Sequence, residues 1–380
     1  MREIVFVAGE VSGDLHAARV VRELAARGAA TRFRTVGIGG DEMRAAGVEL
    51  VEHVEQLAVM GFIEVLEHVP KHWALLRALE RRIKSGSVAL VVLIDYPTFN
   101  MKVADAAAAA GVPVLYYVTP QVWAWGADRL ARLARTITRA AVILPFEEAL
   151  LQAHKIDATF VGHPLLDRPD YRMDRCEARR SLGLRDDARV LALFPGSRAQ
   201  EIRRHLEGFV ETARELQRRD PGLQVVVSAA PHVELDARRC PFPTVRSASF
   251  TVLRAADAAL CKSGTTTLEA AVAGCPLVVA YRTSRLTYAA ARRLVKISNI
   301  GLVNVVAGTR VAPEFVQDAF RSAAVADALA PLLDRASAER RVMIEGLARV
   351  RASLGQPGAA GRVADMALSL AERGGENDGQ

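Results

Sequence analysis

The sequence predicts an α/β protein with two Rossmann-like domains that face a central cleft. Three observations favour this fold class. Its 380 residues are too many for one ordinary core and suit two domains of roughly 150–200 residues each. Half of the residues (51%) are hydrophobic but only 6% are aromatic, a composition typical of parallel sheets covered by helices. In each half of the chain, a series of short apolar runs also alternates with longer helical patterns.

The first half contains six short apolar runs, separated by helical segments such as 13–27 and 101–110. Each run is apolar on both faces, which is typical of a buried parallel strand. A βαβ series of this kind places its ligand crevice at the carboxyl ends of the strands. The predicted strands are Glu3–Ala8, Arg32–Gly37, Ala89–Ile94, Val114–Val118, Ala141–Leu144 and Thr159–Val161.

A polar stretch at 163–187 interrupts this alternation. It contains Pro164 and Pro169 and has no strand pattern, so we interpret it as the connection between the domains. The alternation then restarts, which predicts a second domain of the same class. Its predicted strands are Val190–Phe194, Gln224–Ala229, Ala258–Cys261 and Leu277–Ala280.

The tail from about Ala323 is rich in Ala, Leu and Arg and is predicted to be helical, with an interruption at 355–361. These patterns predict an N-terminal domain at 1–170, a C-terminal domain at 171–350, and a C-terminal helix at 351–372 that packs back on the N-terminal domain.

Net charge and cysteine content indicate which kinds of molecule the protein binds and in which cellular compartment it works. The net charge of +7 favours anionic partners, which include nucleic acid, phosphorylated small molecules and acidic membranes. The four cysteines form no C-x-x-C pair, which predicts reduced thiols in the cytosol and argues against zinc. No apolar stretch reaches about 18 residues, and the N-terminal apolar run is too short for a signal peptide. We therefore expect a cytoplasmic protein.

Acidic side chains follow two of the predicted strands in the first domain. Glu10 and Asp14 lie in the loop at 8–14, and Asp95 follows the strand at 89–94, with Asn100 five residues later. Carboxylates at strand ends suit hydroxyl recognition or acid–base catalysis. The alternative for each is a capped turn at the start of a helix.

The loop at 119–129 carries two tryptophans, Trp123 and Trp125. If the segment is extended, their alternate spacing puts them on the same side. They either stack on a ligand or hold the loop against the core, which is the more common role of tryptophan.

The second domain contains two segments suited to a diphosphate. Arg198 follows the strand at 190–194, where its guanidinium can bind a diphosphate bidentately; a structural ion pair is the alternative. The segment 262–271 places Ser263, Gly264, Thr265 and Thr266 at the start of a helix, with Glu269 one turn on, where it can bond ribose hydroxyls. No Walker A loop is present, so ATP hydrolysis is disfavoured. No D-x-D motif is present either, so we predict that no metal is required.

The order of several motifs identifies a resemblance over residues 3–320. They are AGEVSGD, MGFIEVL, DYPTFN, TPQVWAWGADR, LPFE, VGHPL, PGSRAQEI and SGTTTLE. Together they resemble the lipid A disaccharide synthases, glycosyltransferase family 19. The resemblance implies a GT-B fold and an inverting sugar transfer without a cofactor. The implied donor is UDP-2,3-diacylglucosamine and the implied acceptor is 2,3-diacylglucosamine 1-phosphate (lipid X). The products would be a β-1′,6-linked tetraacyl disaccharide 1-phosphate and UDP.

The resemblance also assigns roles to individual residues. Asp95 matches the carboxylate that helps to deprotonate the acceptor 6-hydroxyl, and Glu10 or a water relay could share that task. Arg198 matches the diphosphate-binding arginine. The UDP site is predicted to comprise Arg198, Ser263, Gly264, Thr265, Thr266, Glu269, Asn304 and Gln317. The acceptor side is predicted to comprise Ser12, Gly13, Asp14, Asn100, Gln121 and Trp123.

Because both implied substrates carry acyl chains, the resemblance implies a peripheral association with the cytoplasmic face of the inner membrane. The segments 57–79 and 285–297 mix apolar and basic residues and could make this contact, or they could be ordinary core-facing helices. A homo-oligomer is compatible with the sequence. The alternatives are another UDP-GlcNAc-using GT-B transferase or a UDP-sugar 2-epimerase, a two-lobed binding protein of the periplasmic type, and a nucleic-acid-binding protein. No recognised nucleic-acid motif supports the last of these.

Overall fold

The computed structural model describes residues 1–380 except 55–63, 126, 232, 285–287, 289–298 and 377–380. The chain divides into two compact units, each described here by itself. Unit 1 comprises Met1–Pro164 together with Gly355–Gln380, and unit 2 comprises Leu165–Leu354. The chain therefore passes between the units at 164/165 and 354/355, a few residues from the predicted boundaries at 170/171 and 350/351.

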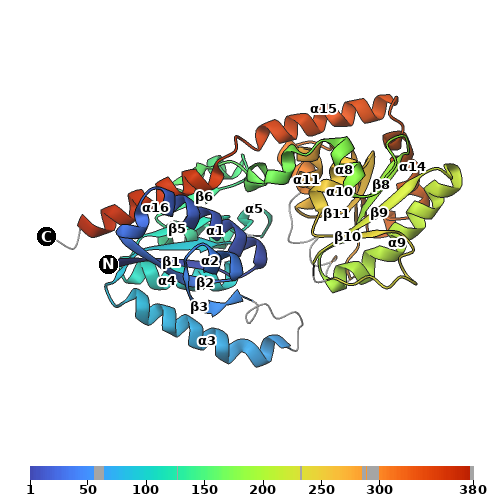
Figure 1. Ribbon diagram of the computed structural model, residues 1–380. Helices are drawn as coiled ribbons and strands as arrows, with labels where there is room; N and C mark the ends of the chain where they lie inside the picture. The colour runs from blue at the N-terminus through green and yellow to red at the C-terminus, as the bar shows by residue number, and fades with distance from the viewer. Residues whose placement is uncertain (55–63, 126, 232, 285–287, 289–298, 377–380) are drawn as a thin grey trace. The chain divides into compact units, whose positions relative to one another are not determined.

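Unit 1 is built on a seven-stranded parallel sheet with the order β3-β2-β1-β4-β5-β6-β7 (Figure 1). The six predicted strands are present. Strand β3 was not predicted, because the sequence Glu-Leu-Val-Glu-His of this edge strand is partly exposed and lacks an apolar run. The strands are β1 (Arg2–Ala8), β2 (Phe33–Gly39), β3 (Glu49–His53), β4 (Val88–Ile94), β5 (Val114–Tyr117), β6 (Arg139–Val142) and β7 (Ala158–Phe160).

Helices cover both faces of this sheet and create two cores. One core joins β1 and β4 to α1 and α16, and the other joins the opposite face to α3, α4 and α6 (Figure 1). The helices of unit 1 are α1 (Val11–Ala26), α2 (Asp41–Ala45), α3 (Glu64–Ile83), α4 (Pro97–Ala109), α5 (Val122–Trp125), α6 (Ala127–Thr136), α7 (Glu147–Ala153) and α16 (Ala359–Glu376).

Helix α16 completes unit 1 from the far end of the sequence. Val363, Ala364 and Ala367 are fully buried in the core that contains α1 and β4. An ion pair flanks these buried residues, with Arg27 Nε 2.6 Å from Asp365 Oδ1. Arg362 Nε also donates to the carbonyl oxygen of Val161 at 2.9 Å. The N-terminal sheet therefore depends on a helix that is contributed after the whole of unit 2.

Unit 2 is built on a six-stranded parallel sheet with the order β10-β9-β8-β11-β12-β13 (Figure 1). Its four predicted strands are present, and the two edge strands β10 and β13, of three residues each, were not predicted. The strands are β8 (Val190–Phe194), β9 (Gln224–Ala229), β10 (Thr244–Arg246), β11 (Ala258–Lys262), β12 (Leu277–Tyr281) and β13 (Glu314–Val316). The helices are α8 (Arg175–Ser181), α9 (Ala199–Arg219), α10 (Ser249–Ala255), α11 (Thr266–Ala273), α13 (Leu302–Ala307), α14 (Ser322–Leu333) and α15 (Ala338–Ser353).

The interpretation of 163–187 as an interdomain connection is wrong for most of its length. Helix α8 belongs to unit 2, where Arg179 is only 1% exposed. Arg179 Nη2 donates to the fully buried carboxylate of Asp257 at 2.8 Å. The polar composition that suggested a linker is therefore that of a buried ionic cluster.

Asp257 is the centre of this cluster, at the amino-terminal edge of the sheet in unit 2. Its Oδ2 accepts from the backbone N–H of Val190 at 2.9 Å, and Arg335 Nε donates to its Oδ1 at 2.9 Å. Arg175 also pairs with the carboxylate. Burial alone would raise the pKa of Asp257, but the hydrogen bonds from Arg335 and Arg175 outweigh it and lower the pKa to about 2. This carboxylate is therefore ionised and paired at neutral pH.

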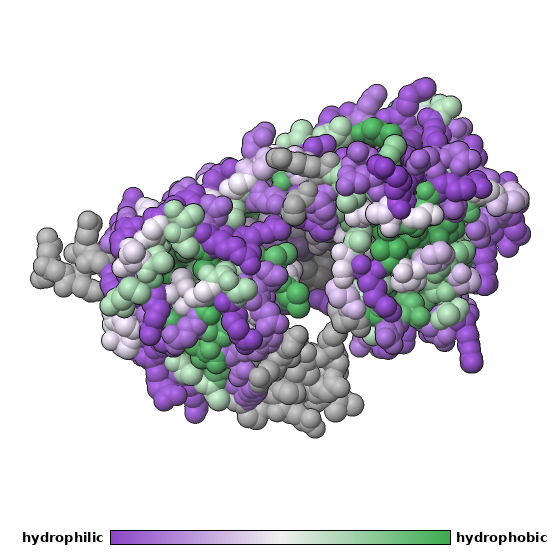
Figure 2. Space-filling view, in the orientation of Figure 1, coloured by the Kyte–Doolittle hydropathy of each residue, from purple (hydrophilic) through white to green (hydrophobic). Residues whose placement is uncertain are grey.

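On the face seen in Figure 2, hydrophilic residues cover most of the helices of each unit, and hydrophobic residues come into view between them. Among the helices that the structure describes, none has both the length and the apolar character needed to cross a membrane.

Candidate functional site

The carboxyl ends of β1 and β4 lie side by side in unit 1, with Ala8 opposite Ile94. Glu10 is exposed at the start of α1, and Asp95 is half-buried directly after β4. The loops that carry the two predicted acidic residues are thus neighbours, as expected for a crevice at the strand ends.

The backbone at Asp95 has an unusual conformation. Asp95 and Tyr96 both have φ of 50°, in the left-handed region that non-glycine residues rarely adopt. The carbonyl oxygen of Asp95 accepts from Asn100 Nδ2 at 2.7 Å and from the Tyr116 hydroxyl at 2.8 Å. Asn100 Nδ2 also lies 3.3 Å from the carbonyl oxygen of Val7, in β1. These bonds fix the turn, so Asn100 holds the backbone of Asp95 in place.

Tyr96 brings the two loops into contact and was not singled out from the sequence. A Cβ added at Gly9 would lie 2.1 Å from Tyr96 Cγ, so only glycine leaves room for this ring. The Tyr96 hydroxyl lies 3.0 Å from His72 Nε2. Burial, together with the charge of Glu10, raises the pKa of Tyr96. The signal available in the sequence was its place between Asp95 and Pro97 at a strand end.

Asp14 is 3% exposed and binds backbone N–H groups. Its Oδ1 accepts from Gly40 at 2.7 Å and from Met43 at 3.0 Å, and its Oδ2 accepts from Glu42 at 3.1 Å. The carboxylate caps α2 from a different helix, where the helix dipole also stabilises it. We therefore propose that Asp14 acts on the acceptor side by positioning α2.

Asp14→Ala is expected to lower the free energy of unfolding by about 2–3 kcal/mol, because it leaves the buried N–H groups of α2 without an acceptor. Asp14→Asn keeps one acceptor oxygen and should lose less. Urea denaturation followed by circular dichroism measures both. Equal stability of Asp14→Ala and wild type would show that α2 does not need this cap.

The other acceptor-side residues differ in burial. Gly13 packs against β1 and β4, since an added Cβ would lie 3.3 Å from Ala8 Cβ and 3.5 Å from Ile94 Cγ2. Ser12 and Gln121 are exposed. The structure brings Gly13 to the strand ends as a packing residue and leaves the hydroxyl of Ser12 and the amide of Gln121 at the surface.

Trp123 lies in helix α5, so the segment is not extended and the condition under which both tryptophans would lie on one side is not met. Its Nε1 donates to Glu147 Oε1 at 3.1 Å, and its ring packs edge-on against Phe146. Glu147 Oε2 accepts from the backbone N–H of Leu144 at 3.1 Å. Glu147 therefore ties the loop after β5 to the turn after β6. The side chain of Trp125 lies outside the described residues.

Burial raises the pKa of Glu147 to about 7, although the bonds from Leu144 and Trp123 partly oppose this. Between about pH 4.5 and 7 the folded protein therefore holds a proton that the unfolded chain has released. The stability from this group is present in full below the lower value and is lost as the pH rises through the upper one.

The free energy of unfolding of the wild type is accordingly expected to fall by about 3 kcal/mol more than that of Glu147→Gln between pH 4.5 and 7.5, at roughly 1.4 kcal/mol per pKa unit. Denaturation at a series of pH values tests this. The exposed Glu345 on α15 provides the matched control, and Glu345→Gln should follow the wild type. Parallel curves for Glu147→Gln and wild type would contradict the raised pKa.

In unit 2 the two predicted diphosphate segments follow adjacent strands, since Phe194 of β8 lies opposite Cys261 of β11. Arg198 is exposed at the N-cap of α9, after a tight turn in which Gly196 has φ of 131°. Thr265 is exposed at the N-cap of α11, followed by the half-buried Thr266. The structure thus brings Arg198 and the start of α11 to the same edge of one sheet.

The loop that contains Ser263 and Gly264 is held by bonds to its neighbours. The Ser263 hydroxyl donates to the carbonyl oxygen of Ile300 at 2.7 Å, and the Thr267 hydroxyl donates to that of Gly264 at 2.9 Å. Thr267 Oγ1 also accepts from the backbone N–H of Val303 at 3.2 Å. The side chain of Ser263 therefore anchors the loop, while the start of α11 remains at the surface.

Glu269 is the least satisfied acidic residue of this region. Arg168 Nη1 donates to its Oε1 at 3.2 Å, and within the described part of the chain its buried Oε2 has no hydrogen-bond partner. Burial raises the pKa of Glu269, and the charge of Arg168 together with the nearby Ser249 hydroxyl only partly offsets this. A buried acceptor of this kind suits a hydroxyl donor from a ligand. Arg168, which also pairs with Asp170, was not predicted from the sequence.

Asn304 and Gln317 both bind the protein itself. Asn304 is fully buried and bonds the backbone of Val311 and Ala312 and the carboxylate of Glu314 at 2.8–2.9 Å. Gln317 bonds both the N–H and the carbonyl oxygen of Thr283, at 2.9 and 3.1 Å. We propose that they shape the donor side indirectly, through the loops that they hold.

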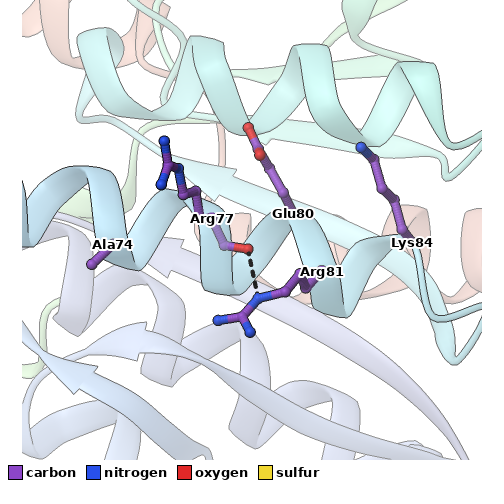
Figure 3. Close-up of a pocket in the computed structure, with 5 residues that line it drawn as sticks. All are labelled: Ala74, Arg77, Glu80, Arg81 and Lys84. Carbon is purple, nitrogen blue, oxygen red and sulfur yellow. Dashed lines mark hydrogen bonds between the residues drawn. The ribbon is translucent and has the colours of Figure 1, made fainter.

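The described residues offer no metal site, and the pocket along α3 lies outside the strand ends. Within the described residues, no group of three or more His, Cys, Asp or Glu side chains is arranged to hold a metal ion. A pocket lies along α3 and is lined by Ala74, Arg77, Glu80, Arg81 and Lys84 (Figure 3). Arg81 Nε donates to the carbonyl oxygen of Arg77 at 3.4 Å, and three of the five lining residues are basic. Its residue Lys84 lies four positions before β4 begins at Val88, whereas Asp95 follows the carboxyl end of that strand.

Known proteins with this fold divide into close relatives and distant ones. The chain is 41% identical over 378 residues to "Lipid-A-disaccharide synthase" of Geobacter metallireducens, with 97% of both chains covered. Two solved structures share the fold at lower identity. The calicheamicin glycosyltransferase CalG4 has a TM-score of 0.63 at 20% identity, over 98% of this chain and 99% of its own. The UDP-GlcNAc 2-epimerase from Neisseria meningitidis, bound to UDP-GlcNAc, has a TM-score of 0.65 at 12% identity, over 97% and 100%.

The predicted fold class, a GT-B-type protein with two Rossmann-like domains, is confirmed by both sheets and by these structures. The alternative of another UDP-GlcNAc-using transferase or epimerase is not favoured, because the relative at 41% identity carries a different name. The family described as Lipid-A-disaccharide synthetase matches residues 4–354. The chain is therefore a glycosyltransferase that belongs to the lipid-A-disaccharide synthase family.

Proposed function

We propose that this enzyme transfers 2,3-diacylglucosamine from UDP-2,3-diacylglucosamine to the 6-hydroxyl of 2,3-diacylglucosamine 1-phosphate, with inversion at the sugar C1. The products are the β-1′,6-linked tetraacyl disaccharide 1-phosphate and UDP. Unit 2 binds the donor, and unit 1 binds the acceptor and supplies the base. The observation that carries the proposal is the arrangement of Arg198, the start of α11 and the unpartnered Oε2 of Glu269 in one unit.

The donor side is built for a nucleoside diphosphate. The guanidinium of Arg198 and the N–H groups at the start of α11 stabilise the diphosphate, and they stabilise it more as charge develops on the leaving UDP. A ribose hydroxyl donates to Glu269 Oε2, the buried acceptor that lacks a partner within the described protein. Ser263, Asn304 and Gln317 keep the surrounding loops in place.

The acceptor side is built for proton transfer. Asp95 accepts the proton of the acceptor 6-hydroxyl as that oxygen attacks the sugar C1, and the bond from C1 to the diphosphate oxygen breaks on the opposite face. UDP leaves with the bonding electrons. Asn100 and Tyr116 hold the strained turn of Asp95, which keeps the carboxylate in one position. Glu10, beside Tyr96, is placed to share the proton.

The test is turnover with defined lipids. The purified protein is incubated with UDP-2,3-diacylglucosamine and lipid X in detergent micelles, with EDTA present, and UDP and disaccharide are quantified. Equal amounts of UDP and disaccharide are expected, at a rate that EDTA does not change. UDP release that requires a different acceptor would discard the proposed reaction while keeping a glycosyltransferase. Loss of activity in EDTA would contradict the predicted absence of a metal requirement.

We also propose that the enzyme associates peripherally with the cytoplasmic face of the inner membrane, through α3. Trp73 on this helix is 49% exposed, with Lys102 Nζ 4.6 Å from its ring. Arg77, Arg81 and Lys84 are exposed on the same helix (Figure 3). A basic face with an exposed tryptophan suits anionic lipid headgroups. The rest of the segment 57–79 lies partly outside the described residues, and so does most of 285–297.

Sedimentation with vesicles tests this contact. The wild type is expected to bind vesicles that contain phosphatidylglycerol and to bind them less when salt is raised. Arg77→Glu/Arg81→Glu should bind them at least about tenfold more weakly, since each basic residue near the surface contributes about 1 kcal/mol. Arg349→Glu/Arg351→Glu on α15 is the control for the same change of charge. Equal binding by both double variants would assign the contact to another surface.

A further inference from the structure

An ion pair between Glu201 and Lys262 lies at the carboxyl ends of the two central strands of unit 2. Lys262 Nζ donates to Glu201 Oε1 at 2.9 Å, and the two side chains are 19% and 17% exposed. Lys262 ends β11, and Glu201 lies in the first turn of α9, which follows β8. The pair therefore joins the loop of Arg198 to the loop that opens α11.

The second oxygen of Glu201 fixes the turn that carries Arg198. Glu201 Oε2 accepts from the backbone N–H of Ser197 at 3.1 Å and from that of Arg198 at 3.4 Å. A Cβ added at Gly196 would lie 2.7 Å from Glu201 Cβ and 2.8 Å from Oε2. The carboxylate is thus packed directly against the turn, and the backbone of Arg198 cannot shift without breaking these contacts.

The same carboxylate creates an electrostatic problem for a donor site. It occupies the N-terminus of α9, the end of a helix that favours an anionic ligand. An uncompensated negative charge there would repel a diphosphate bound by Arg198. The Lys262 ammonium offsets this charge. It also lies beside the second loop, since a Cβ added at Gly264 would be 3.7 Å from Nζ.

Glu201 is ionised in this pair. Burial alone would raise the pKa of Glu201, but the hydrogen bond and the charge of Lys262 outweigh it and lower that pKa.

His205 links Glu201 to the next strand end. The carbonyl oxygen of Glu201 lies 2.6 Å from His205 Nδ1, and His205 Nε2 accepts from the backbone N–H of Arg282 at 2.9 Å. Because Arg282 follows β12, three neighbouring strand ends are linked through Glu201.

We propose that Glu201 and Lys262 are a positioning pair for the diphosphate of the donor. Glu201 fixes the turn from which Arg198 extends, and Lys262 cancels the charge of Glu201 so that this turn accepts an anion. The inference rests on the proposed function, in which unit 2 binds a nucleoside diphosphate. Neither residue needs to touch the sugar that is transferred.

The test measures UDP binding by isothermal titration calorimetry, so that it does not depend on turnover. Lys262→Met, which leaves the Glu201 charge uncompensated, is expected to weaken UDP binding by about tenfold or more. The double variant Glu201→Gln/Lys262→Met removes the charge while keeping an acceptor oxygen for the turn. It should recover most of the lost affinity. Uridine, measured by ligand-observed NMR, should bind all variants equally because it carries no phosphate.

Folding and specificity are controlled separately. Lys262→Gln repeats the charge removal in case Lys262→Met is poorly folded, and the exposed Lys155→Met in unit 1 controls for loss of one lysine. Wild-type affinity for UDP in both Lys262 variants would overturn the proposed role of the pair. A double variant that binds UDP no more tightly than Lys262→Met would overturn it as well. If the Lys262 variants lose as much affinity for uridine as for UDP, the pair supports the fold of the site and does not act on the diphosphate, which would also overturn the proposal. Absence of UDP binding by the wild type would instead overturn the proposed donor site, and the pair with it.

Discussion

Asp95→Asn is expected to lower kcat for disaccharide formation by about 10²–10⁴-fold, the range over which a positioned general base accelerates proton transfer. Asparagine retains the shape of the side chain and adopts positive φ more readily than most residues, so the strained turn at Asp95 should persist. Steady-state kinetics with both lipid substrates measure the loss. The affinity for UDP should not change, because Asp95 belongs to unit 1.

The exposed Asp157→Asn, in the same unit, is the matched control and should retain wild-type kcat. Glu10→Gln tests whether the second carboxylate shares the proton. If it does, Glu10→Gln lowers kcat on its own and adds little to Asp95→Asn, since residues that act as one unit are not additive. Wild-type kcat in Asp95→Asn would remove Asp95 from the mechanism.

Asp257→Ala is expected to lower the free energy of unfolding of unit 2 by about 3–5 kcal/mol, the cost of breaking a buried ion pair by removing one partner. Arg179 would remain almost fully buried without its carboxylate, and the backbone N–H of Val190 would lose its acceptor. Urea denaturation followed by circular dichroism measures the loss. Asp187→Ala, at an exposed aspartate that pairs with Arg185, controls for the loss of one surface acid.

The same cluster predicts how unit 2 responds to acid. Because the pKa of Asp257 is lowered from 3.8 to about 2, its contribution to stability is present above the higher value. That contribution is lost as the pH falls through the lower value. Asp257→Ala should therefore differ most from wild type above pH 4 and least near pH 2. A difference from Asp187→Ala of less than about 0.5 kcal/mol at neutral pH would show that the cluster does not stabilise the fold.

The fold could be predicted from local patterns because its central strands are buried on both faces. The runs at Val88–Ile94 and Val190–Phe194 are entirely buried. A continuous apolar run of this kind predicts a buried strand even when the neighbouring strands are unknown. The edge strands Glu49–His53, Thr244–Arg246 and Glu314–Val316 were missed because they are short, partly exposed and interrupted by polar residues, so none has a continuous apolar run. Helix α8 was taken for a linker because its arginines face a carboxylate 78 or more positions away.

The candidate site divides in the same way. Asp95 and Arg198 could be proposed because each follows a predicted strand, where a parallel sheet places its ligands. The bonds of Asp14 to α2, of Asn304 to 311–314 and of Glu147 to Trp123 join residues that the sequence separates, so it does not reveal them. Glu201 is the exception. It lies three residues after the N-cap Arg198, a position from which a glutamate can accept from the N-cap backbone N–H, so its contact with the turn follows from sequence spacing alone.

The return of α16 to unit 1 has a consequence for synthesis of the protein. Ribosomes release a chain from its N-terminus, and domains generally fold as they emerge. Here the core of β1, β4 and α1 lacks Val363, Ala364 and Ala367 until all of Leu165–Leu354 has been translated. The first unit to leave the ribosome is thus the last to be completed. Until then, the apolar residues of α1 and β4 that pack against α16 lack their partners, for the time needed to make the other unit.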